Sequence, residues 1–307
     1  MTRPVVIIAG PTASGKSALA LDIAKALDGC VINADSMQIY RDLAILTARP
    51  DAEALAQAPH RLYGVLDGAE LCTAARWAEM ALREIAEAQD QGLLPILVGG
   101  TGMYLRVLVE GIAPVPEIPE EIRATTRTLH GEIGAAEFHA TLAAIDPVMA
   151  ARLRPSDAQR LMRAHEVVTA TGCSLAAWQE EGRRQRRIEP LAFTLLPPRD
   201  DLYAACDGRF ARMVETGALA EVAGLAARDL DADRPIMKAL GVPELLRHQA
   251  GLVDLATAIK LGQQATRNYA KRQTTWFRHQ MPYANPIFEK YNYNIAPLIC
   301  QKIVSAA

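Results

Sequence analysis

The chain has 307 residues, half of them hydrophobic, and a formal net charge of −2. This composition suits one large or two modest globular domains and excludes a global basic bias toward nucleic acid, so any polyanion contact must come from local patches. The five cysteines and six histidines lack the spacing of a disulfide framework or a metal site, and no apolar run is long enough to cross a membrane. We therefore expect a cytoplasmic protein with reduced cysteines, no signal peptide and no membrane partner.

An apolar strand over residues 5–9 opens the chain, and a glycine-rich turn follows it directly. The phosphate-binding pattern G-x-x-x-x-G-K-[ST] is met by Gly10-Pro11-Thr12-Ala13-Ser14-Gly15-Lys16-Ser17, and a helical pattern begins at Ala18. Strand, glycine loop and helix are the context that this motif requires. The glycines let successive N–H groups point at one anion, the lysine adds a positive charge, and the Ser17 hydroxyl can hold Mg²⁺. We predict a diphosphate-binding or nucleotide-binding loop, with an ordinary glycine-rich turn as the alternative.

Strand and helix patterns alternate through the next hundred residues. The sequence predicts strands over 30–33, 62–66 and 94–98 and a helix over 74–89. This rhythm indicates a parallel sheet covered by helices, and ligands of such sheets bind at the carboxyl ends of the strands. The three segments that fall at strand ends should converge on one crevice: Gly10–Ser17, Asp35 and Gly99–Thr101.

A proline-rich stretch over residues 114–119 interrupts the alternation. Residues 120–182 read as helices only, a strand pattern returns at 191–196, and residues 201–280 are again helical. We predict an α/β fold of the P-loop NTPase-like type, a parallel sheet flanked by helices, formed by residues 1–114 plus 190–307. An all-helical subdomain over residues 115–189 is inserted in it.

Two side chains at the expected crevice are candidates for chemistry. Nucleotide hydrolases with this loop usually carry a carboxylate after a later strand, but the strand 94–98 leads into Gly99-Gly100-Thr101, which counts against a hydrolysis motor. A carboxylate instead follows the second strand, as Asp35, where it could accept a proton from a substrate nucleophile or cap a turn. Thr101 could donate to a phosphate or sugar oxygen, or cap the helix expected after it.

Two basic patches are candidates for RNA contacts. One interleaves cations with aromatic residues, as suits backbone contacts and base stacking: Arg267, Tyr269, Lys271, Arg272, Trp276, Phe277 and Arg278. The other lies in the helical segment and comprises Gln159, Arg160, Leu161, Met162 and Arg163, with Arg152 and Arg154 nearby. In both cases the alternative is a solvated helix face above ordinary core residues.

Taken together, these residues resemble the bacterial tRNA dimethylallyltransferase (tRNA isopentenyltransferase) family. The resemblance spans nearly the whole chain and does not rest on the glycine loop alone. It is specific, because few proteins with the glycine loop carry the other segments in this order. The segments that carry it are Gly10–Ser17, Asp35-Ser36-Met37-Gln38-Ile39-Tyr40, Pro59-His60-Arg61-Leu62, Gly99–Leu105, Asp157–Ala164 and Thr266–Arg278.

The resemblance implies transfer of a dimethylallyl group from dimethylallyl diphosphate to the N6 amine of the adenine on the 3′ side of the anticodon in tRNA, with release of diphosphate and no use of ATP. Asp35 matches the family's catalytic aspartate, which takes the N6 proton. Thr101 matches a threonine that contacts substrate near the reacting groups. Lys16, the loop N–H groups and Mg²⁺ at Ser17 would stabilise the leaving diphosphate.

The resemblance also implies which residues contact tRNA, because the target adenine must leave its stack to reach a buried carboxylate. The implied set is Asp35, Ser36, Met37, Gln38, Thr101, Arg123, Gln159, Arg160, Leu161, Met162, Arg163, Lys271, Arg272, Gln273, Thr274, Thr275, Trp276, Phe277 and Arg278. The helical subdomain would clamp the anticodon stem-loop, and we expect a monomer.

Some positions depart from the family pattern. The family often has glycine where this chain has Leu46, and lysine where it has Arg49. Lys238 stands where arginine is frequent, and Val242 replaces the usual aromatic after Gly241 and is followed by Pro243. The departures leave the residues expected in the catalytic core intact.

Three other functions are open on sequence. In a small-molecule kinase Asp35 would deprotonate a hydroxyl and Mg²⁺-ATP would fill the loop, but the helical insertion would then have no role. Prenylation of free AMP or ADP would not need the segment Gln159–Arg163. In a nucleotide-dependent RNA-binding switch without catalysis, Asp35 and Thr101 would have no chemical task.

Overall fold

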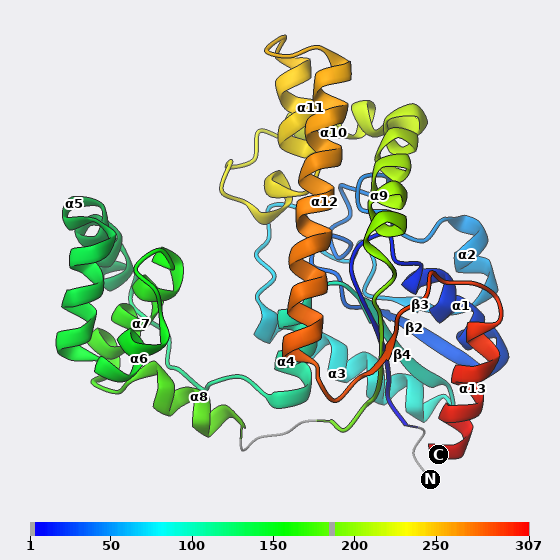
Figure 1. The fold of residues 1–307 in the computed structure, drawn as a ribbon, viewed down its shortest axis with the longest axis horizontal. Coiled ribbons are helices and arrows are strands. Elements are labelled where there is room, and N and C mark those ends of the chain that lie inside the picture. The colour runs from blue at the N-terminus through cyan, green and yellow to red at the C-terminus, as the bar shows by residue number, and fades with distance from the viewer. Residues whose placement is uncertain (1–3, 184–187, 307) are drawn as a thin grey trace. The chain divides into compact units, whose positions relative to one another are not determined.

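The computed structural model describes residues 4–183 and 188–306. The chain divides into two compact units (Figure 1). Met1–Leu108 and Ile188–Ala307 form the sheet unit, and Val109–Arg187 forms the helical unit.

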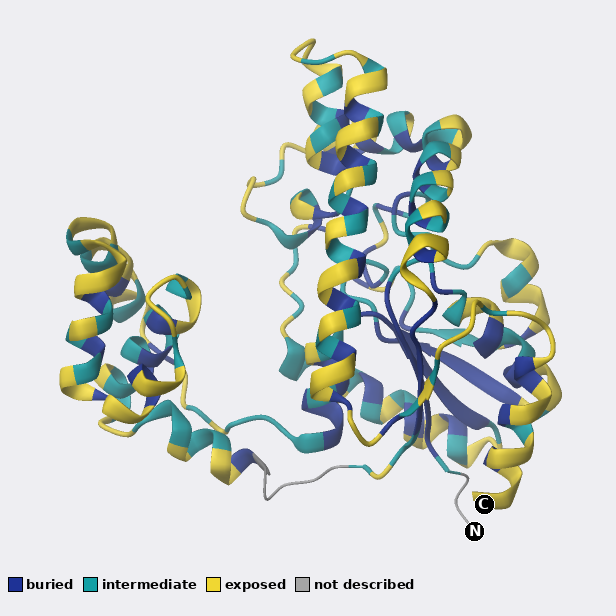
Figure 2. Ribbon diagram, in the orientation of Figure 1, coloured by how far each residue is buried: buried dark blue, intermediate teal, exposed yellow. Residues whose placement is uncertain are grey.

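Six parallel strands form the centre of the sheet unit, in the order β3-β2-β4-β1-β5-β6. Their bounds are β1 Val6–Ala9, β2 Gly29–Asn33, β3 His60–Arg61, β4 Leu94–Gly99, β5 Leu191–Leu195 and β6 Asn285–Ile287. The strands of the sheet centre are buried along their whole length (Figure 2), which explains their unbroken apolar runs. The predicted parallel sheet is confirmed.

The prediction of a strand over 62–66 is wrong in position. The strand is His60–Arg61, and the chain turns at Leu62 (φ 64°) and Gly64 (φ 64°), a left-handed backbone that cannot continue a strand. Leu66 keeps only an isolated parallel bridge with Tyr40. The edge strand β6 was not predicted, since its three residues include a proline and show no alternation.

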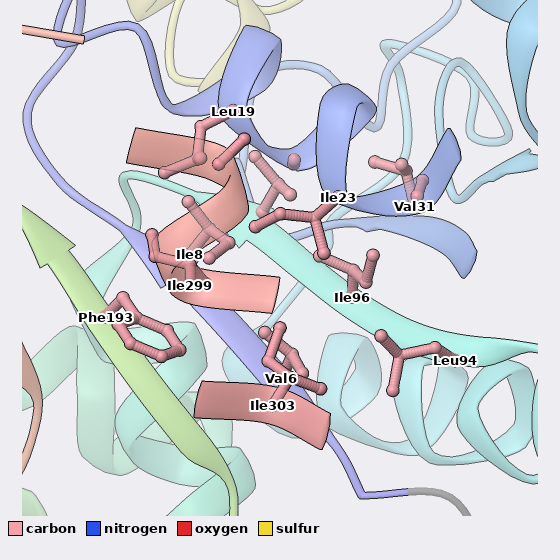
Figure 3. Close-up of a cluster of buried hydrophobic side chains, with 14 of the residues drawn as sticks. Val6, Ile8, Leu19, Ile23, Val31, Leu94, Ile96, Phe193, Ile299 and Ile303 are labelled. Atoms are coloured by element: carbon pink, nitrogen blue, oxygen red, sulfur yellow. The ribbon is translucent and has the colours of Figure 1, made fainter. Parts of the chain in front are cut away.

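Helices cover both faces of the sheet. On one face, α1 (Lys16–Ala26) and α13 (Ile295–Ala306) pack on β1, β2, β4 and β5, and Figure 3 shows the side chains that meet there. Helix α3 (Ala74–Asp90) sends Trp77 toward β2, where the indole N–H donates to Asn33 O at 2.9 Å, and the ring stacks on Tyr104 of α4 (Gly102–Glu110). The short helix α2 (Ala52–Gln57) is capped by Asp51.

Residues 199–280 form a helical assembly beyond the carboxyl edge of the sheet. Its elements are α9 (Arg199–Met213), a π-helical turn (Val214–Ala218), α10 (Leu219–Ala226), a 3₁₀ turn (Pro235–Lys238), α11 (Val242–Gln249) and α12 (Leu255–Gln280). Helices α9 and α12 pack against each other in opposite directions, because Cys206 contacts Ala270 while Phe210, further along α9, faces Gly262, earlier on α12.

The helical unit has a core of its own. Its helices are α5 (Glu120–Ile145, interrupted at Gly134), α6 (Pro147–Arg152), α7 (Ala158–Thr171) and α8 (Leu175–Arg183). Phe138, Leu142 and Leu161 are fully buried in that core. The expectation of helices alone over 120–182 agrees with every element described there.

Candidate active site

Three loops leave the carboxyl ends of neighbouring strands β2, β4 and β1. The loops after β2 and β4 are bonded to each other: Thr101 N donates to Ala34 O at 3.3 Å, and Ser36 N donates to Thr101 Oγ1 at 2.9 Å. Strand β1 ends at Ala9, opposite Gly99, so the phosphate loop starts beside them. The three segments therefore lie at one edge of the sheet.

The phosphate loop has the geometry of an anion site. Ala13 (φ 63°) and Gly15 (φ 90°) adopt left-handed backbone between β1 and α1, which curls the chain around the helix start. The Ser14 hydroxyl is buried and has no hydrogen-bond partner among the described residues. An unpartnered buried hydroxyl is costly, and a bound phosphate oxygen would satisfy it.

Two cations stand beside the loop. Lys16 is the first residue of α1, and its Nζ donates to Pro11 O at 3.3 Å. Burial lowers the pKa of Lys16 to about 8, with the Asp35 charge opposing the shift and Arg209 adding to it. Arg209 of α9 donates to the Thr12 hydroxyl, and burial lowers its pKa as well. A dianionic group would relieve the repulsion between these cations.

Sequence reasoning missed Arg209. It lies in a segment predicted only as helix, with no motif around it. One signal was available, because Cys206, Phe210 and Met213 form an apolar stripe at helical spacing and Arg209 falls within that stripe. A charge on the buried face of a helix usually has a partner or a ligand.

The Asp35 carboxylate caps a turn and also lines a cavity, which is compatible with both roles left open by the sequence. Its Oδ1 accepts from Met37 N at 2.9 Å, which caps the turn after β2. The buried Asn33 holds the same turn, accepting from Asp35 N at 2.8 Å and donating to Asp35 O at 3.0 Å. The carboxylate also lines a cavity of about 510 Å³. The Asp35 charge contributes, after burial, to the raised pKa of Tyr269 across that cavity.

The Thr101 hydroxyl connects two loops instead of capping α4. It accepts from Ser36 N and donates to Ser36 Oγ at 3.2 Å. The hydroxyl therefore fixes the Asp35 turn relative to the loop after β4.

The cavity is lined by both polar and apolar side chains. The polar lining residues are Thr12, Asp35, Ser36, Thr47, Arg209, Asp233, Lys238, Thr266, Tyr269 and Arg272. The apolar lining residues are Met37, Leu46, Cys206, Phe210, Met213, Pro235, Ala239 and Leu240. A cavity of this size with this mixed lining suits a ligand with an anionic part and a hydrocarbon part.

Residues 36–50 form the rim of this cavity and are held from two sides. Gln38 Nε2 donates to Thr47 O at 2.8 Å and to Ala48 O at 2.9 Å, which closes the loop on itself. Glu221 of α10, also missed from sequence, accepts the backbone N–H groups of Ala44, Ile45 and Leu46.

Two of the positions that depart from the family pattern, Leu46 and Lys238, line the cavity. Lys238 also pairs with Asp233 at 2.8 Å. Gly241 is the N-cap of α11, Val242 is fully buried, and Pro243 stands in the first turn, where a helix needs no N–H donor.

Three residues of the basic segment on α12 pack inward, against other segments of the sheet unit. Gln273 is 5% exposed; its side chain accepts from Thr12 N and donates to Gly100 O, both at 2.8 Å. Trp276 packs on Gly102, and Phe277 is buried. Gln273 therefore joins the phosphate loop to the loop after β4.

The remaining members of that segment face outward. Lys271, Thr275 and Arg278 are exposed at positions i, i+4 and i+7 of α12. Arg272 lies over the Tyr269 ring, 5.6 Å from its centroid, and lines the cavity. Thr274 is partly buried. The helix thus divides into a bracing face and a cationic face.

The candidate tRNA-binding residues of the helical unit also include both exposed and buried side chains. Gln159 and Arg160 are exposed on α7, Met162 and Arg163 are partly buried, and Leu161 is fully buried in the unit's core. Arg163 pairs with Glu166 at 3.5 Å. Arg123 of α5 is partly exposed and lies 3.9 Å from Glu120.

Comparison with known proteins gives consistent results. The IPP transferase family model matches residues 38–280. A tRNA dimethylallyltransferase of Rhodospirillum centenum is 57% identical over 282 residues, which cover 91% of this chain and 90% of the relative. One of Paramagnetospirillum magneticum is 55% identical over 304 residues, covering 98% and 96%.

Solved structures agree. A full-length tRNA isopentenylpyrophosphate transferase of Bacillus halodurans superposes with a TM-score of 0.70 at 32% identity, covering 99% of this chain and 97% of that one. A eukaryotic dimethylallyltransferase, solved acting on tRNA, shares the fold with a TM-score of 0.86 at 24% identity, covering 99% and 80%. The predicted P-loop NTPase-like fold is confirmed by these likenesses.

Proposed function

This chain belongs to the IPP transferase family, and from that premise we propose that it is a tRNA dimethylallyltransferase. It transfers the dimethylallyl group of dimethylallyl diphosphate to the N6 amine of the adenine that follows the anticodon on its 3′ side. One observation carries the proposal: Thr12 of the phosphate loop, the Arg209 guanidinium and the Asp35 carboxylate line one cavity that also has apolar side chains, and the buried Lys16 interacts electrostatically with both Asp35 and Arg209.

The proposed step is a substitution at the allylic carbon. The adenine N6 lone pair forms a bond to C1 of the dimethylallyl group while the bond from C1 to the diphosphate oxygen breaks, and its electron pair leaves with the diphosphate. Asp35 accepts the proton that N6 loses. Lys16, Arg209 and the loop amides stabilise the negative charge that develops on the leaving group.

The donor set at the loop fits Mg²⁺. Ser17 is exposed at the second position of α1 and offers a hydroxyl oxygen next to the place where phosphate oxygens would bind, and oxygen ligands are those that Mg²⁺ prefers. Among the described residues no cluster of three His, Cys, Asp or Glu side chains could hold a metal alone, so Ser17 and the diphosphate would share it. Bound there, the ion would neutralise diphosphate charge.

The tRNA would be held by exposed cations and rim residues. On the sheet unit these are Ser36, Met37, Gln38 and Thr101 around the adenine and Lys271, Arg272, Thr275 and Arg278 on α12. On the helical unit they are Arg123, Gln159, Arg160, Met162 and Arg163, and we propose that this unit binds the anticodon stem-loop. Leu161, Gln273, Trp276 and Phe277 are buried or packed against neighbours, so they would act by positioning those residues, as would Thr274.

Labelled substrates test the proposal directly. The protein is incubated with labelled dimethylallyl diphosphate, Mg²⁺ and unmodified tRNA, in parallel with AMP or ADP in place of tRNA and with labelled ATP in place of the donor. We expect label in tRNA alone. Label in free AMP would favour nucleotide prenylation, and phosphate transfer from ATP would favour a kinase.

The cellular setting belongs to the proposal. Within the described ranges, none of the helices combines the length and the apolar character that crossing a bilayer demands. We propose that the protein works as a monomer in the cytoplasm, where its tRNA substrate is. A sedimentation velocity run that shows a dimer at working concentration would contradict the monomer.

A further inference from the structure

The apolar residues that α9 contributes to the cavity lie progressively further from the phosphate loop. On α9, Cys206 Sγ lies 4.0 Å from Thr12 O and Arg209 contacts the Thr12 hydroxyl, so this part of the helix stands at the loop. Met213 follows four residues later and also lines the cavity, about 6 Å further along the helix axis. The phosphate loop therefore lies at the Thr12 end of the cavity, and Met213 supplies an apolar side chain further along α9; the lining also includes Lys238, which is paired with Asp233.

Helix α12 gives the same direction independently. Gln273 bonds to Thr12 N at the loop end, whereas Gly262, eleven positions earlier, faces Phe210. Between them, Thr266 and Tyr269 line the cavity. A ligand with its diphosphate at the loop would thus direct its hydrocarbon part along both helices toward Phe210.

Two glycines fix the position of the Phe210 ring. Phe210 is only 3% exposed. A Cβ at Gly262 would overlap the ring, and a Cβ at Gly241 would lie 2.7 Å from Phe210 Cε2 and 3.0 Å from Leu46 Cδ2. The ring is seated against the backbone of α12 and the start of α11, so it cannot retreat further from the cavity.

We propose that Phe210, seated on Gly241 and Gly262, is the end wall for the prenyl chain and limits the donor to five carbons. This inference rests on the proposed transferase function and deepens it by naming what selects the donor. A rigid aromatic wall excludes a longer chain by overlap, and the phenyl ring is about the size of one further isoprene unit.

The test compares dimethylallyl diphosphate with the ten-carbon geranyl diphosphate on unmodified tRNA. The wild-type protein should use the five-carbon donor and show negligible transfer from the ten-carbon one. Phe210→Ala should raise the ratio of kcat/KM for the longer donor over the shorter at least about 100-fold, and Phe210→Leu should give a smaller rise. The KM for tRNA should not change.

A reverse change provides a second test should Phe210→Ala fold poorly. Gly262→Ala pushes the ring toward the cavity, so it should raise the KM for the five-carbon donor without admitting the longer one. Phe193→Leu, in the sheet core away from the cavity, serves as the control for loss of a buried phenylalanine and should leave the donor ratio unchanged.

The results of these experiments distinguish a failure of the proposed transferase function from a failure of the Phe210 end wall. A wild-type protein that transfers nothing from dimethylallyl diphosphate to tRNA refutes the proposed function. An active wild type with an unchanged donor ratio in both Phe210 variants, or a wild type that already uses geranyl diphosphate, refutes the end wall alone. A raised KM for tRNA with an unchanged KM for the donor would place the adenine in this space and refute it too.

Discussion

The strand-end site of the sheet unit and the α7 surface of the helical unit hold their polar residues in different ways. At the strand ends, Asp35 accepts from Met37 N and Thr101 accepts from Ser36 N, each at 2.9 Å, and Gln273 of α12 accepts from Thr12 N at 2.8 Å. On α7, Arg160 has a side chain 74% exposed and lies 3.9 Å from Asp157. One set is fixed by the fold and the other is solvated.

The difference indicates how the two regions would contribute to catalysis and to tRNA binding. Groups that act on a reacting atom must be preorganised, because a small misplacement costs rate. Groups that contact phosphates of a large substrate act through charge and tolerate loose geometry. We therefore expect substitutions at the strand ends to lower kcat, and substitutions on α7 to raise the KM for tRNA.

The largest effect should follow from Asp35→Asn. The amide can still accept from Met37 N and cap the turn, but it cannot take the N6 proton, so kcat should fall about 10³-fold. Binding of tRNA, measured by filter retention, should change little. Asp51→Asn, a helix cap on α2, is the matched control and should retain full turnover. Full turnover in Asp35→Asn would remove the carboxylate from the mechanism.

Arg209→Met should have the second largest effect. It removes one of the two cations beside the loop, and loss of one donor to a developing anion typically lowers the rate about 10²-fold. Single-turnover rates with saturating tRNA measure this. Arg212→Met, exposed one turn later on α9, removes the same charge away from the cavity and should be silent. Equal losses in the two variants would indicate a general charge effect.

The pH dependence of donor binding should show a tenfold effect. The pKa of Lys16 is about 8 because burial lowers it, so the ammonium is charged at neutral pH and loses its proton as the pH rises through that value. Affinity for inorganic diphosphate should then fall about tenfold per pH unit. Calorimetric titrations of the wild type and Lys16→Met measure it, since the variant retains only the ligand's own titration. Identical slopes in the two proteins would contradict a role for Lys16.

The sheet could be predicted from sequence because its strands are buried on both faces and are apolar without interruption, as in Val6–Ala9 and Leu94–Gly99. Residues near the sheet edges could not be. The turn at Leu62 depends on a left-handed backbone conformation, which a leucine in the sequence does not predict. The edge strand β6, Asn285–Ile287, pairs only with β5, and its sequence has no strand pattern.

The candidate site likewise contains residues that could be predicted from the sequence and residues that could not. The phosphate loop and Asp35 could be predicted because each follows an apolar strand directly. No motif marks Arg209, Phe210 or Glu221. Arg209 and Phe210 reach the cavity, and Glu221 reaches the loop at its rim, only through the packing of α9, α10 and α12, which are distant in sequence from the phosphate loop. A sequence motif identifies functional residues that lie close together along the chain. These residues are instead brought to the cavity or its rim by tertiary contacts.

The smallest effect should come from Arg160→Ala on the helical unit. If its guanidinium contacts one tRNA phosphate, the KM for tRNA should rise about threefold to tenfold, and the slope of log affinity against log salt should become about one unit shallower. The kcat should stay unchanged, because no strand-end group moves. Arg83→Ala, exposed on α3, changes the net charge equally and should alter neither quantity. A lowered kcat in Arg160→Ala would mean that α7 helps to assemble the catalytic site, and the distinction between the two regions would fail.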